Sequence, residues 1–593
     1  MMFTRGLVFV VVFAQAGCGG DETQADETGP TSASDSSGSG SGETDTPTSG
    51  GETSAADAGS TGTGTTVIGT EGTDTSGEEA TSSTGDPDAD CFQGSISAHD
   101  PYADLALANL VGFECMTGSL SIHNATITDL QALSSLRRIG KHFEIGNTSL
   151  TSLAGLENLE EIGEGLYINS SWEITDVSAL AKLRSVGGRF IFNYVGAQEL
   201  ALPLLTTIEG ELSLSGTNLV NLDGLANLTS VGGPLSIDSC DQLTSLDGLA
   251  GLTTIGGALE VSKNDQLVDI SGLAGLTSGV TTVEIAKNAA LTTIGAWSIG
   301  DVESLAIVDN DALLAVGGFA GVTAIAGDLT ITGNAALGEV GFAALSEVGG
   351  NLYIKGNEAL AGVGFAELVE VVGDLHVTDN EVLVDLAGLD ALTAVGGLLL
   401  IEDNAGLVEL NGLDALTGAG SLRIAFNAGM QGLGGLDALT AVDSVEVADN
   451  DAMLALDGLG ALAASSGLSV QGNDALVSLA SLASLMEVES LSIGGNAALT
   501  GLDGLDGLAS VKWFRVEDND ALVSIDAVVL GAGGSLATVE IYASVVDNDA
   551  LPTCVAHALQ EALTDPPEYF CYTPNKADAC LGDPDFCHPL ENP

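Results

Sequence analysis

Apolar residues recur along most of the chain in a motif of the form L-x-I-x-x-N, which returns about every 23 residues from Leu120 to Asn519. In one copy Leu329 and Ile331 alternate with polar residues, which predicts a short strand with one buried face. The next copy begins at Leu352. A fixed period of this length predicts a solenoid, in which each coil buries its apolar residues against the neighbouring coils.

A second apolar cluster follows each strand and has the form G-L-x-x-L-x-x-V-G-G, as in residues 388–397. It is compatible with a short turn or with a second strand. The Gly pair that ends it, Gly396 and Gly397 in this copy, predicts a corner that needs a positive φ or a close approach of the backbone. In the coil around Asn334 we expect these side chains inside: Leu329, Ile331, Asn334, Leu337, Val340, Phe342, Leu345 and Val348.

Most copies of the motif end in Asn, so equivalent side chains would stack from coil to coil as a ladder. A side-chain amide can donate to and accept from the backbone of adjacent coils, so we interpret the ladder as structural. In the first coils we assign the ladder positions to Asn124, Asn147, Ser171, Tyr194, Thr217 and Cys240. The series then continues through Asn264, Asn288, Asn310, Asn334, Asn357, Asn380, Asn404, Asn427, Asn450, Asn473, Asn496, Asn519 and Asn548.

The pattern resembles leucine-rich repeats, whose consensus L-x-x-L-x-L-x-x-N/C-x-L also accepts Cys at the Asn position, as Cys240 would do here. The N-x-x-L spacing from Asn334 to Leu337 brings it closer to the receptor L domain, a β-helical ligand-binding repeat of receptors and of some bacterial surface proteins. The resemblance implies a mainly β fold, a parallel β-solenoid with about 23 residues per coil. It specifies a fold rather than a ligand, because such folds have many partners.

The remaining segments differ in composition from the repeats. We assign 1–18 to a signal peptide, 19–90 to a disordered acidic linker rich in Gly, Ser and Thr, 91–118 to an N-terminal cap, 119–548 to the solenoid and 549–593 to a Cys-rich C-terminal cap. The linker holds too few apolar residues to offset the entropy of ordering it.

The N-terminus predicts export from the cytoplasm. Arg5 precedes a short apolar run, and Ala16-Gly17-Cys18 resembles a bacterial lipobox, in which the Cys is lipidated. Gln15 stands where that motif places Leu, so ordinary signal cleavage is the alternative interpretation. We expect a lipid anchor at Cys18 and a location in the bacterial cell envelope, at the outer-membrane surface, or otherwise a secreted chain.

Seven of the eight cysteines lie outside the repeats, and Cys240 lies within them. Export to an oxidising compartment allows disulfides that staple both caps. The candidates for these disulfides are Cys91, Cys115, Cys554, Cys571, Cys580 and Cys587. The last four allow three pairings. A zinc site with His557 and His588 is the competing interpretation at the C-terminus.

The formal net charge is −68, from 82 acidic and 14 basic residues, which argues against binding to nucleic acid. Acidic residues flank the ladder, and a row of like charges is favourable only if it is solvated, screened or bridged by cations. We interpret the row as solvated and expect no metal or other cofactor. The alternative is calcium, bound at Asp309, Asp311, Asp449, Asp451, Asp518 and Asp520.

The middle residue of each L-x-I unit is expected to point outward, and we call these residues the outward row. Four consecutive coils place Tyr353, His376, Leu400 and Arg423 in this row, which makes them our preferred binding patch. Trp513 and Arg515 form a second candidate, and Glu540 would continue the outward row beyond Arg515. Ordinary drift among repeats is the alternative interpretation.

No H-E-x-x-H, G-x-S-x-G or phosphate-loop motif is present, so we expect no enzymatic activity and assign no catalytic residue. We predict a non-enzymatic recognition or adhesion protein, anchored to the cell envelope by its lipid, that binds a protein or glycan along one solenoid face. One alternative is a structural envelope or matrix protein without a specific ligand. Another is a β-helical polysaccharide-degrading enzyme that uses paired carboxylates.

Overall fold

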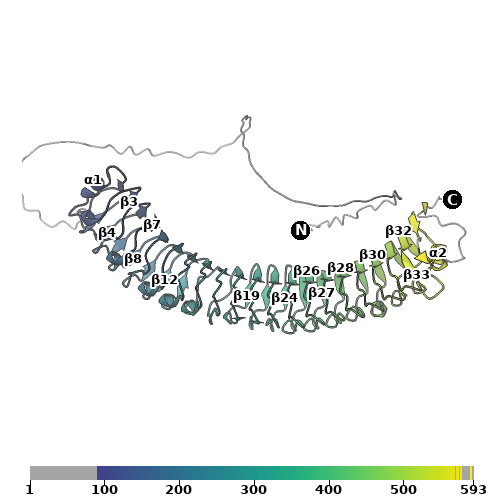
Figure 1. Cartoon of the computed structure of the whole chain (residues 1–593). Coiled ribbons are helices and arrows are strands. Elements are labelled where there is room, and N and C mark those ends of the chain that lie inside the picture. Colours follow the sequence, from purple (N-terminus) through teal and green to yellow (C-terminus); the bar gives the residue numbers. More distant parts are fainter. Residues whose placement is uncertain (1–87, 89, 568, 573–574, 577–587, 590–593) are drawn as a thin grey trace, which may run out of the picture. The chain divides into compact units, whose positions relative to one another are not determined.

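The computed structural model describes residues 88, 90–567, 569–572, 575–576 and 588–589. The predicted signal peptide, Cys18 and nearly all of the predicted linker therefore lie outside the described residues. The described chain is a parallel β-solenoid (Figure 1). The predicted fold class is confirmed.

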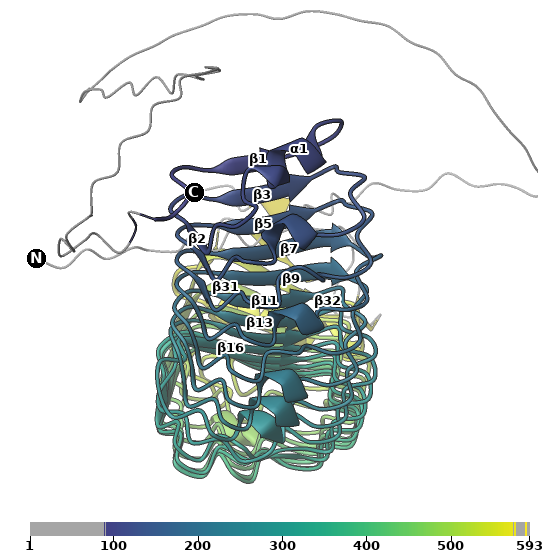
Figure 2. The same ribbon diagram turned by 90° about the vertical axis from the view of Figure 1, so that its left-hand side faces the viewer.

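The L-x-I strands of successive coils stack in chain order in one long sheet, as β1, β3, β5, β7 and β9 show in Figure 2. Leu329 lies opposite Leu352 and Ile331 opposite Ile354, so each strand pairs in parallel at the period of the sequence motif. Up to β25 the strands are β1 (Ile96–Ala98), β3 (Leu120–His123), β5 (Phe143–Gly146), β7 (Leu166–Ser171), β9 (Phe190–Val195), β11 (Leu212–Ser215), β13 (Leu235–Asp238), β15 (Leu259–Ser262), β16 (Thr282–Ala286), β17 (Ser304–Val308), β20 (Leu329–Thr332), β23 (Leu352–Lys355) and β25 (Leu375–Thr378).

From β26 onward the strands lengthen, because the segment before each L-x-I unit, which is V-G-G only in β26, joins the same strand. These strands are β26 (Ala394–Glu402), β27 (Gly418–Ala425), β28 (Ala441–Ala448), β29 (Ala464–Gln471), β30 (Glu487–Gly494), β31 (Ser510–Glu517) and β32 (Thr538–Val546). The sheet ends with β34 (Tyr569–Cys571), which pairs in parallel with β32, and β36 (His588–Pro589), which pairs antiparallel with β34.

The second apolar cluster of a coil forms a turn and then a short strand, so both interpretations of it hold in different parts of the cluster. Its strands in the first coils form a seven-stranded parallel sheet. They are β2 (Cys115–Met116), β4 (Arg138–Ile139), β6 (Glu161–Ile162), β8 (Ser185–Val186), β10 (Thr207–Ile208), β12 (Ser230–Val231) and β14 (Thr254–Ile255). In later coils the cluster carries β19 (Ala324–Ile325), β22 (Glu347–Val348) and β24 (Glu370–Val371). The strands β18 (Ala315–Val316) and β21 (Glu339–Val340) come just before the cluster and pair with each other. Six of the turns are 3-10 helices, η1 (Gln131–Leu133), η2 (Ser178–Leu180), η3 (Asp223–Leu225), η4 (Asp247–Leu249), η5 (Ser271–Leu273) and η6 (Ala480–Leu482).

The core runs continuously through the coils. All eight side chains that we expected inside the coil of Asn334 are at most 1% exposed. Phe319, Phe342 and Phe365 occupy equivalent positions in adjacent coils, and their rings stack at centroid distances of 5.4 and 5.5 Å. The stacked rings continue the core from coil to coil, which explains why this position accepts a large side chain.

The Gly pair in this corner is required by a close approach of two backbones and not by a left-handed conformation. Neither Gly396 nor Gly397 has a positive φ. A Cβ on Gly396 would lie 2.1 Å from the carbonyl oxygen of Val372 in the preceding coil. The corner therefore brings two backbones together where only glycine fits.

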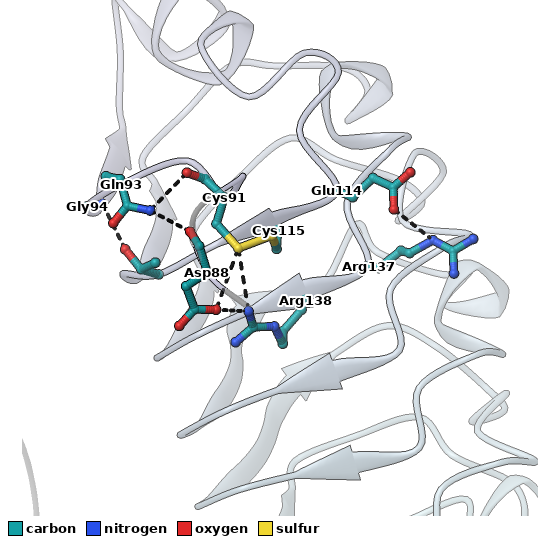
Figure 3. The surroundings of a disulfide bond; sticks show 9 residues. Asp88, Cys91, Gln93, Gly94, Glu114, Cys115, Arg137 and Arg138 are labelled. Atoms are coloured by element: carbon teal, nitrogen blue, oxygen red, sulfur yellow. Dashed lines mark hydrogen bonds and ion pairs between the residues drawn. A yellow bond between two sulfur atoms is a disulfide. The ribbon is translucent and has the colours of Figure 1, made fainter. Parts of the chain in front are cut away.

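The first coil is closed by a helix and a disulfide. The helix α1 (Ala103–Ala108) packs beside β1 and buries Ala103 and Leu107 (Figure 2). Cys91 and Cys115, two of the six disulfide candidates, form a disulfide with each other. Figure 3 shows Asp88 and Arg138 paired next to the Cys91 sulfur.

The last coil is followed by β33 (Asn548–Pro552), the helix α2 (Thr553–Ala562) and β35 (Asn575–Lys576). Cys554 and Cys571 both carry disulfides. Cys580, Cys587 and the His588 side chain lie outside the described residues. Within the described ranges, no helix is both long and apolar enough to cross a bilayer.

Candidate binding surface

The Asn ladder is a buried hydrogen-bond network that fixes the spacing of the coils. The side chain of Asn404 donates from Nδ2 to the carbonyl of Val377 at 2.8 Å, and its Oδ1 accepts the backbone N–H of Asn380 at 3.1 Å. Every ladder Asn from Asn264 to Asn548 is fully buried. Such groups hold the strands in register but offer nothing to a ligand.

The ladder extends one step beyond the predicted series. The backbone N–H of Asn548 donates to Oδ1 of Asn575 at 3.0 Å, and Asn575 Nδ2 donates to the carbonyl of Val545 at 2.6 Å. The sequence signal for Asn575 is hidden, because the C-terminal cap breaks the period. The same network therefore ties the cap to the last coil.

Three ladder assignments in the first coils are wrong by one residue. Asn124, Asn147 and Tyr194 have positive φ values of 48°, 51° and 57°, and their side chains are exposed. The residues after them, Ala125, Thr148 and Val195, occupy the buried ladder position instead. Asn is favoured both in the left-handed region and at the ladder, so composition alone cannot separate the two positions.

The residue before each ladder position adopts the left-handed conformation in every coil from β3 to β32. Asp309 has a φ of 54° and Asp449 a φ of 53°, whereas the equivalent Gly333 and Gly472 have φ values of 70° and 63°. Asp, Asn and Gly are the residues that accept this conformation most readily. The row of Asp residues before the ladder, which Gly interrupts in some coils, is therefore explained by the left-handed backbone at this position.

The acidic pairs around the ladder do not converge on a metal site. In the pairs Asp309 and Asp311, Asp449 and Asp451, and Asp518 and Asp520, a fully buried Asn separates the two acids. Among the described residues, no three His, Cys, Asp or Glu side chains lie close enough together to hold an ion. Burial, together with repulsion from Asp518 and Asp549, raises the pKa of Asp547 at the end of this row.

The preferred binding patch is contiguous across four neighbouring strands. Tyr353 on β23 lies opposite His376 on β25, His376 opposite Leu400 on β26, and Leu400 opposite Arg423 on β27. All four side chains are half-buried. They therefore form one surface held by a rigid sheet.

The two rings at the start of this patch touch. The centroids of Tyr353 and His376 are 5.1 Å apart and the ring planes are perpendicular, which is the edge-to-face arrangement. Burial lowers the pKa of His376 despite the opposing charge of Asp374, and burial with Asp328 and Asp374 raises the pKa of Tyr353. At neutral pH the patch therefore presents a neutral phenol and a neutral imidazole. The His376 Nε2 atom is buried, has no hydrogen-bond partner and lies 3.9 Å from an Asp374 oxygen.

A second set of side chains supports this patch along the edge where the strands begin. Asp328 Oδ1 accepts the backbone N–H of Asn351 at 2.7 Å, Asn351 Oδ1 accepts that of Asp374 at 2.8 Å, and Asp374 Oδ1 accepts that of Leu398 at 2.7 Å. Each carboxylate keeps a second oxygen for other partners. Sequence reasoning missed this row, although an Asp or Asn directly before three successive L-x-I units is a readable signal.

Arg423 is less available than the other members of the patch. Its guanidinium lies 2.6 Å from Glu446 and 3.6 Å from Glu402 on the two adjacent strands. This ion-paired arrangement fixes the side chain over the sheet. Arg423 therefore bounds the patch and contributes little free positive charge.

Trp513 and Arg515 meet around a tyrosine that the sequence prediction missed. Tyr542 lies opposite Trp513, with ring centroids 6.2 Å apart, and the Arg515 guanidinium lies 5.8 Å from the Tyr542 ring centroid. Tyr569 on β34 continues the same line of residues. Arg515 on β31 pairs with Ser544 on β32, so Ser544 takes the position that we assigned to Glu540 in the outward row. The assignment of Glu540 is wrong. The ladder spacing from Asn519 to Asn548 is 29 residues, and this longer coil shifts the register.

No protein-family model and no curated protein matches the chain. Solved structures similar to it include TLR13 in complex with ssRNA13, at 16% identity over 75% of this chain and 79% of that one, with a TM-score of 0.21. A leucine-rich repeat protein from Bacteroides ovatus ATCC 8483 has 10% identity, coverages of 63% and 82%, and a TM-score of 0.20. The plant peptide hormone receptor RGFR1 in complex with RGF2 has 14% identity, coverages of 72% and 91%, and a TM-score of 0.17. These scores are too low for any of the three to bear on the function of this chain.

Proposed function

We propose that this solenoid is a non-enzymatic recognition module that binds a protein or a glycan on the outward face of its long sheet. The observation that carries the proposal is the contiguous run of Tyr353, His376, Leu400 and Arg423 on adjacent strands. Aromatic, imidazole, aliphatic and guanidinium groups side by side on a rigid sheet provide varied contacts for one partner. A purely structural face would have no need for this diversity.

The neighbouring acids favour a partner rich in hydrogen-bond donors. Asp328 and Asp374 each hold the backbone with one oxygen, and Tyr353 lies between their strands in the outward row. Sugar hydroxyls and peptide N–H groups can both donate to such carboxylates while a ring packs on the aromatic side chain. Both classes of partner therefore stay within the proposal.

The test is a binding panel of immobilised envelope polysaccharides and surface proteins, probed with the full chain. We expect capture of at least one panel member, and we expect Tyr353→Ser with His376→Ser to abolish it while the unfolding temperature is kept. The matched control is Ser469→Ala with Ser492→Ala, in the same outward row on β29 and β30. Capture that is unchanged by the first pair would favour a structural protein. Release of soluble sugars from the polysaccharides would instead reveal an enzyme.

We further propose that the solenoid is held at the bacterial outer-membrane surface by acyl chains on Cys18. The support is the sequence of the N-terminus, in which Arg5, an apolar run and Ala16-Gly17-Cys18 follow one another. Expression in a Gram-negative host should give an acylated mass and recovery in the detergent phase, both lost in Cys18→Ala. An unmodified, soluble mature chain from both forms would mean secretion instead.

A further inference from the structure

A line of aliphatic side chains lies exposed on the turns that follow the Asn ladder. In five coils of the C-terminal half of the solenoid, the residue four positions after the ladder Asn is aliphatic. These residues are Val384, Val408, Leu454, Val477 and Val523. These five are 52, 38, 51, 51 and 54% exposed. Gln431 and Thr500, also exposed, occupy the same position in the two intervening coils. We call these seven residues the aliphatic row.

The row is continuous in space because the turns that carry it hydrogen-bond to one another. The backbone N–H of Val408 donates to the carbonyl of Val384 at 3.2 Å, and that of Val477 donates to Leu454 at 3.2 Å. Gln431 links Val408 to Leu454 through the same kind of bond. At a coil spacing of about 4.8 Å, seven positions span about 29 Å.

The aliphatic row is a property of these coils and not of the repeat as such. In an earlier coil Val268 occupies the equivalent position and is 45% exposed, but its hydrogen-bonded neighbours there are Thr244 and Thr292. Single exposed aliphatic side chains are ordinary on protein surfaces, whereas several of them aligned on neighbouring coils mark an interaction site. Val268 is thus an isolated exposed aliphatic side chain in the same repeat.

The charge around the row selects the kind of partner. Asp385 and Glu409 directly follow Val384 and Val408 in the chain. Acids also precede members of the row by three residues, at Glu381, Asp451, Asp474 and Asp520. The only basic residues between 380 and 548 are Arg423, Lys512 and Arg515, and all three lie on the long-sheet strands β27 and β31. The row is therefore rimmed by carboxylates.

A second copy of this chain is a poor occupant for such a surface. Two rows face to face would bring carboxylate against carboxylate, and each chain already carries a formal net charge of −68. Like charges across an interface oppose association, whereas a positive partner is attracted to it. The favoured occupant has an apolar stripe flanked by cations.

We propose that the aliphatic row docks a cationic amphipathic helix of a partner protein. A helix of about 20 residues rises about 30 Å, which matches the length of the row. Apolar side chains at i, i+3, i+4 and i+7 would pack along the row, and flanking Lys or Arg would face its carboxylates. This surface is separate from the outward face of the long sheet, so the two proposals stand or fall independently.

The proposal is tested with a defined probe, a labelled 20-residue peptide with Leu at helical spacing and Lys elsewhere, titrated with the full chain at low salt. We expect Leu454→Ser with Val477→Ser to weaken binding by about tenfold or more, because two central apolar contacts are lost. Val384→Ser with Val408→Ser is a second pair on the same row. Val268→Ser, the matched control, should change the affinity by less than about twofold.

Two further peptides separate the apolar from the electrostatic contribution. A peptide of the same composition, with its Leu residues spread around the helix, should bind weakly and equally to all variants. A peptide with Glu in place of Lys should not bind. Equal affinity of the amphipathic Lys peptide for the wild-type chain and both double variants would overturn the proposal. Self-association of the wild-type chain that the double variants abolish would also overturn it, because the occupant would then be a second copy.

Discussion

Each ladder Asn satisfies backbone groups of two adjacent coils at once. Asn404 accepts the N–H of Asn380 and donates to the carbonyl of Val377, both away from water, and it also donates to the part-buried carbonyl of Glu402. Removing one partner of a buried hydrogen bond leaves the other without water to replace it. The polar residue that recurs at the ladder position is therefore unavailable to a ligand.

Asn404→Ala should lower the free energy of unfolding by about 2–4 kcal/mol, because it leaves the buried N–H of Asn380 and the buried carbonyl of Val377 without their partner. Urea unfolding followed by circular dichroism measures the loss. The control is Asn411→Ala, because Asn411 is exposed and its amide reaches only the Glu409 carboxylate. That change should stay within about 0.5 kcal/mol. Equal effects from the two variants would contradict a structural ladder.

His376 should make the stability of the solenoid depend on pH. Burial holds the pKa of His376 below its ordinary value, with Lys355 acting in the same direction and Asp374 and Glu402 opposing. As the pH falls below about 6.5, the unfolded chain takes up a proton on this residue before the folded chain does. Acidification therefore favours unfolding through His376.

The stability of the wild-type chain relative to His376→Gln should consequently fall between pH 7.5 and pH 5. Urea unfolding of both proteins at several pH values gives this difference directly, and the titration of the many carboxylates cancels in it. A difference that is constant across the range would show that His376 titrates alike in the folded and unfolded chains.

At the scale of the coil, the pattern of buried positions determines most of what the sequence can predict. Leu329 and Ile331 predict their strand correctly, because a buried face needs strict alternation and the period repeats it. The assignment of Asn124 to the ladder is wrong, because Asn suits both that position and the left-handed residue before it. Tyr542 is missed because the longer last coil shifts the register beyond the reach of a fixed period.

Binding residues are harder to predict than buried ones, because exposure alone does not select them. The outward row places Tyr353 and His376 next to each other as the period requires. The ion pairs of Arg423 with Glu402 and Glu446, in contrast, depend on side chains of three strands. The aliphatic row emerges only when burial is compared across coils.

The Gly pair gives a prediction for the corner between coils. Gly396→Ala should destabilise the chain by about 1–3 kcal/mol, because its Cβ would meet the Val372 carbonyl at 2.1 Å. Gly418→Ala is the matched control, since its Cβ would approach nothing closer than 3.4 Å, at the carbonyl of Ala441. Thermal unfolding of the two variants separates the cases. Similar melting temperatures would show that the corner can relax.

At the scale of the whole molecule, each coil is stabilised by its neighbours, so the terminal coils depend on their caps. The disulfide between Cys91 and Cys115, which are 24 residues apart in sequence, ties the cap to the first coils. Closing a loop of this length contributes about 3 kcal/mol in the chain-entropy model.

Cys91→Ser with Cys115→Ser should therefore fray the solenoid from its N-terminal end. Hydrogen exchange should accelerate in residues 91–146, while the coils between 334 and 450 keep their protection. Uniform acceleration along the chain would mean that the solenoid unfolds as a single unit, contrary to nearest-neighbour stabilisation.

The central claim is that partners meet the outward face of the long sheet, and side-chain footprinting tests it most directly. The full chain is oxidised by hydroxyl radicals with and without the partner that the binding panel identifies, and the modified residues are read by mass spectrometry. Protection at Tyr353, His376 and Leu400, with unchanged reactivity at Val268 and Leu314 on the turns, is the predicted result. Protection confined to the turns, with Tyr353 and His376 as reactive as in the free chain, would contradict the account.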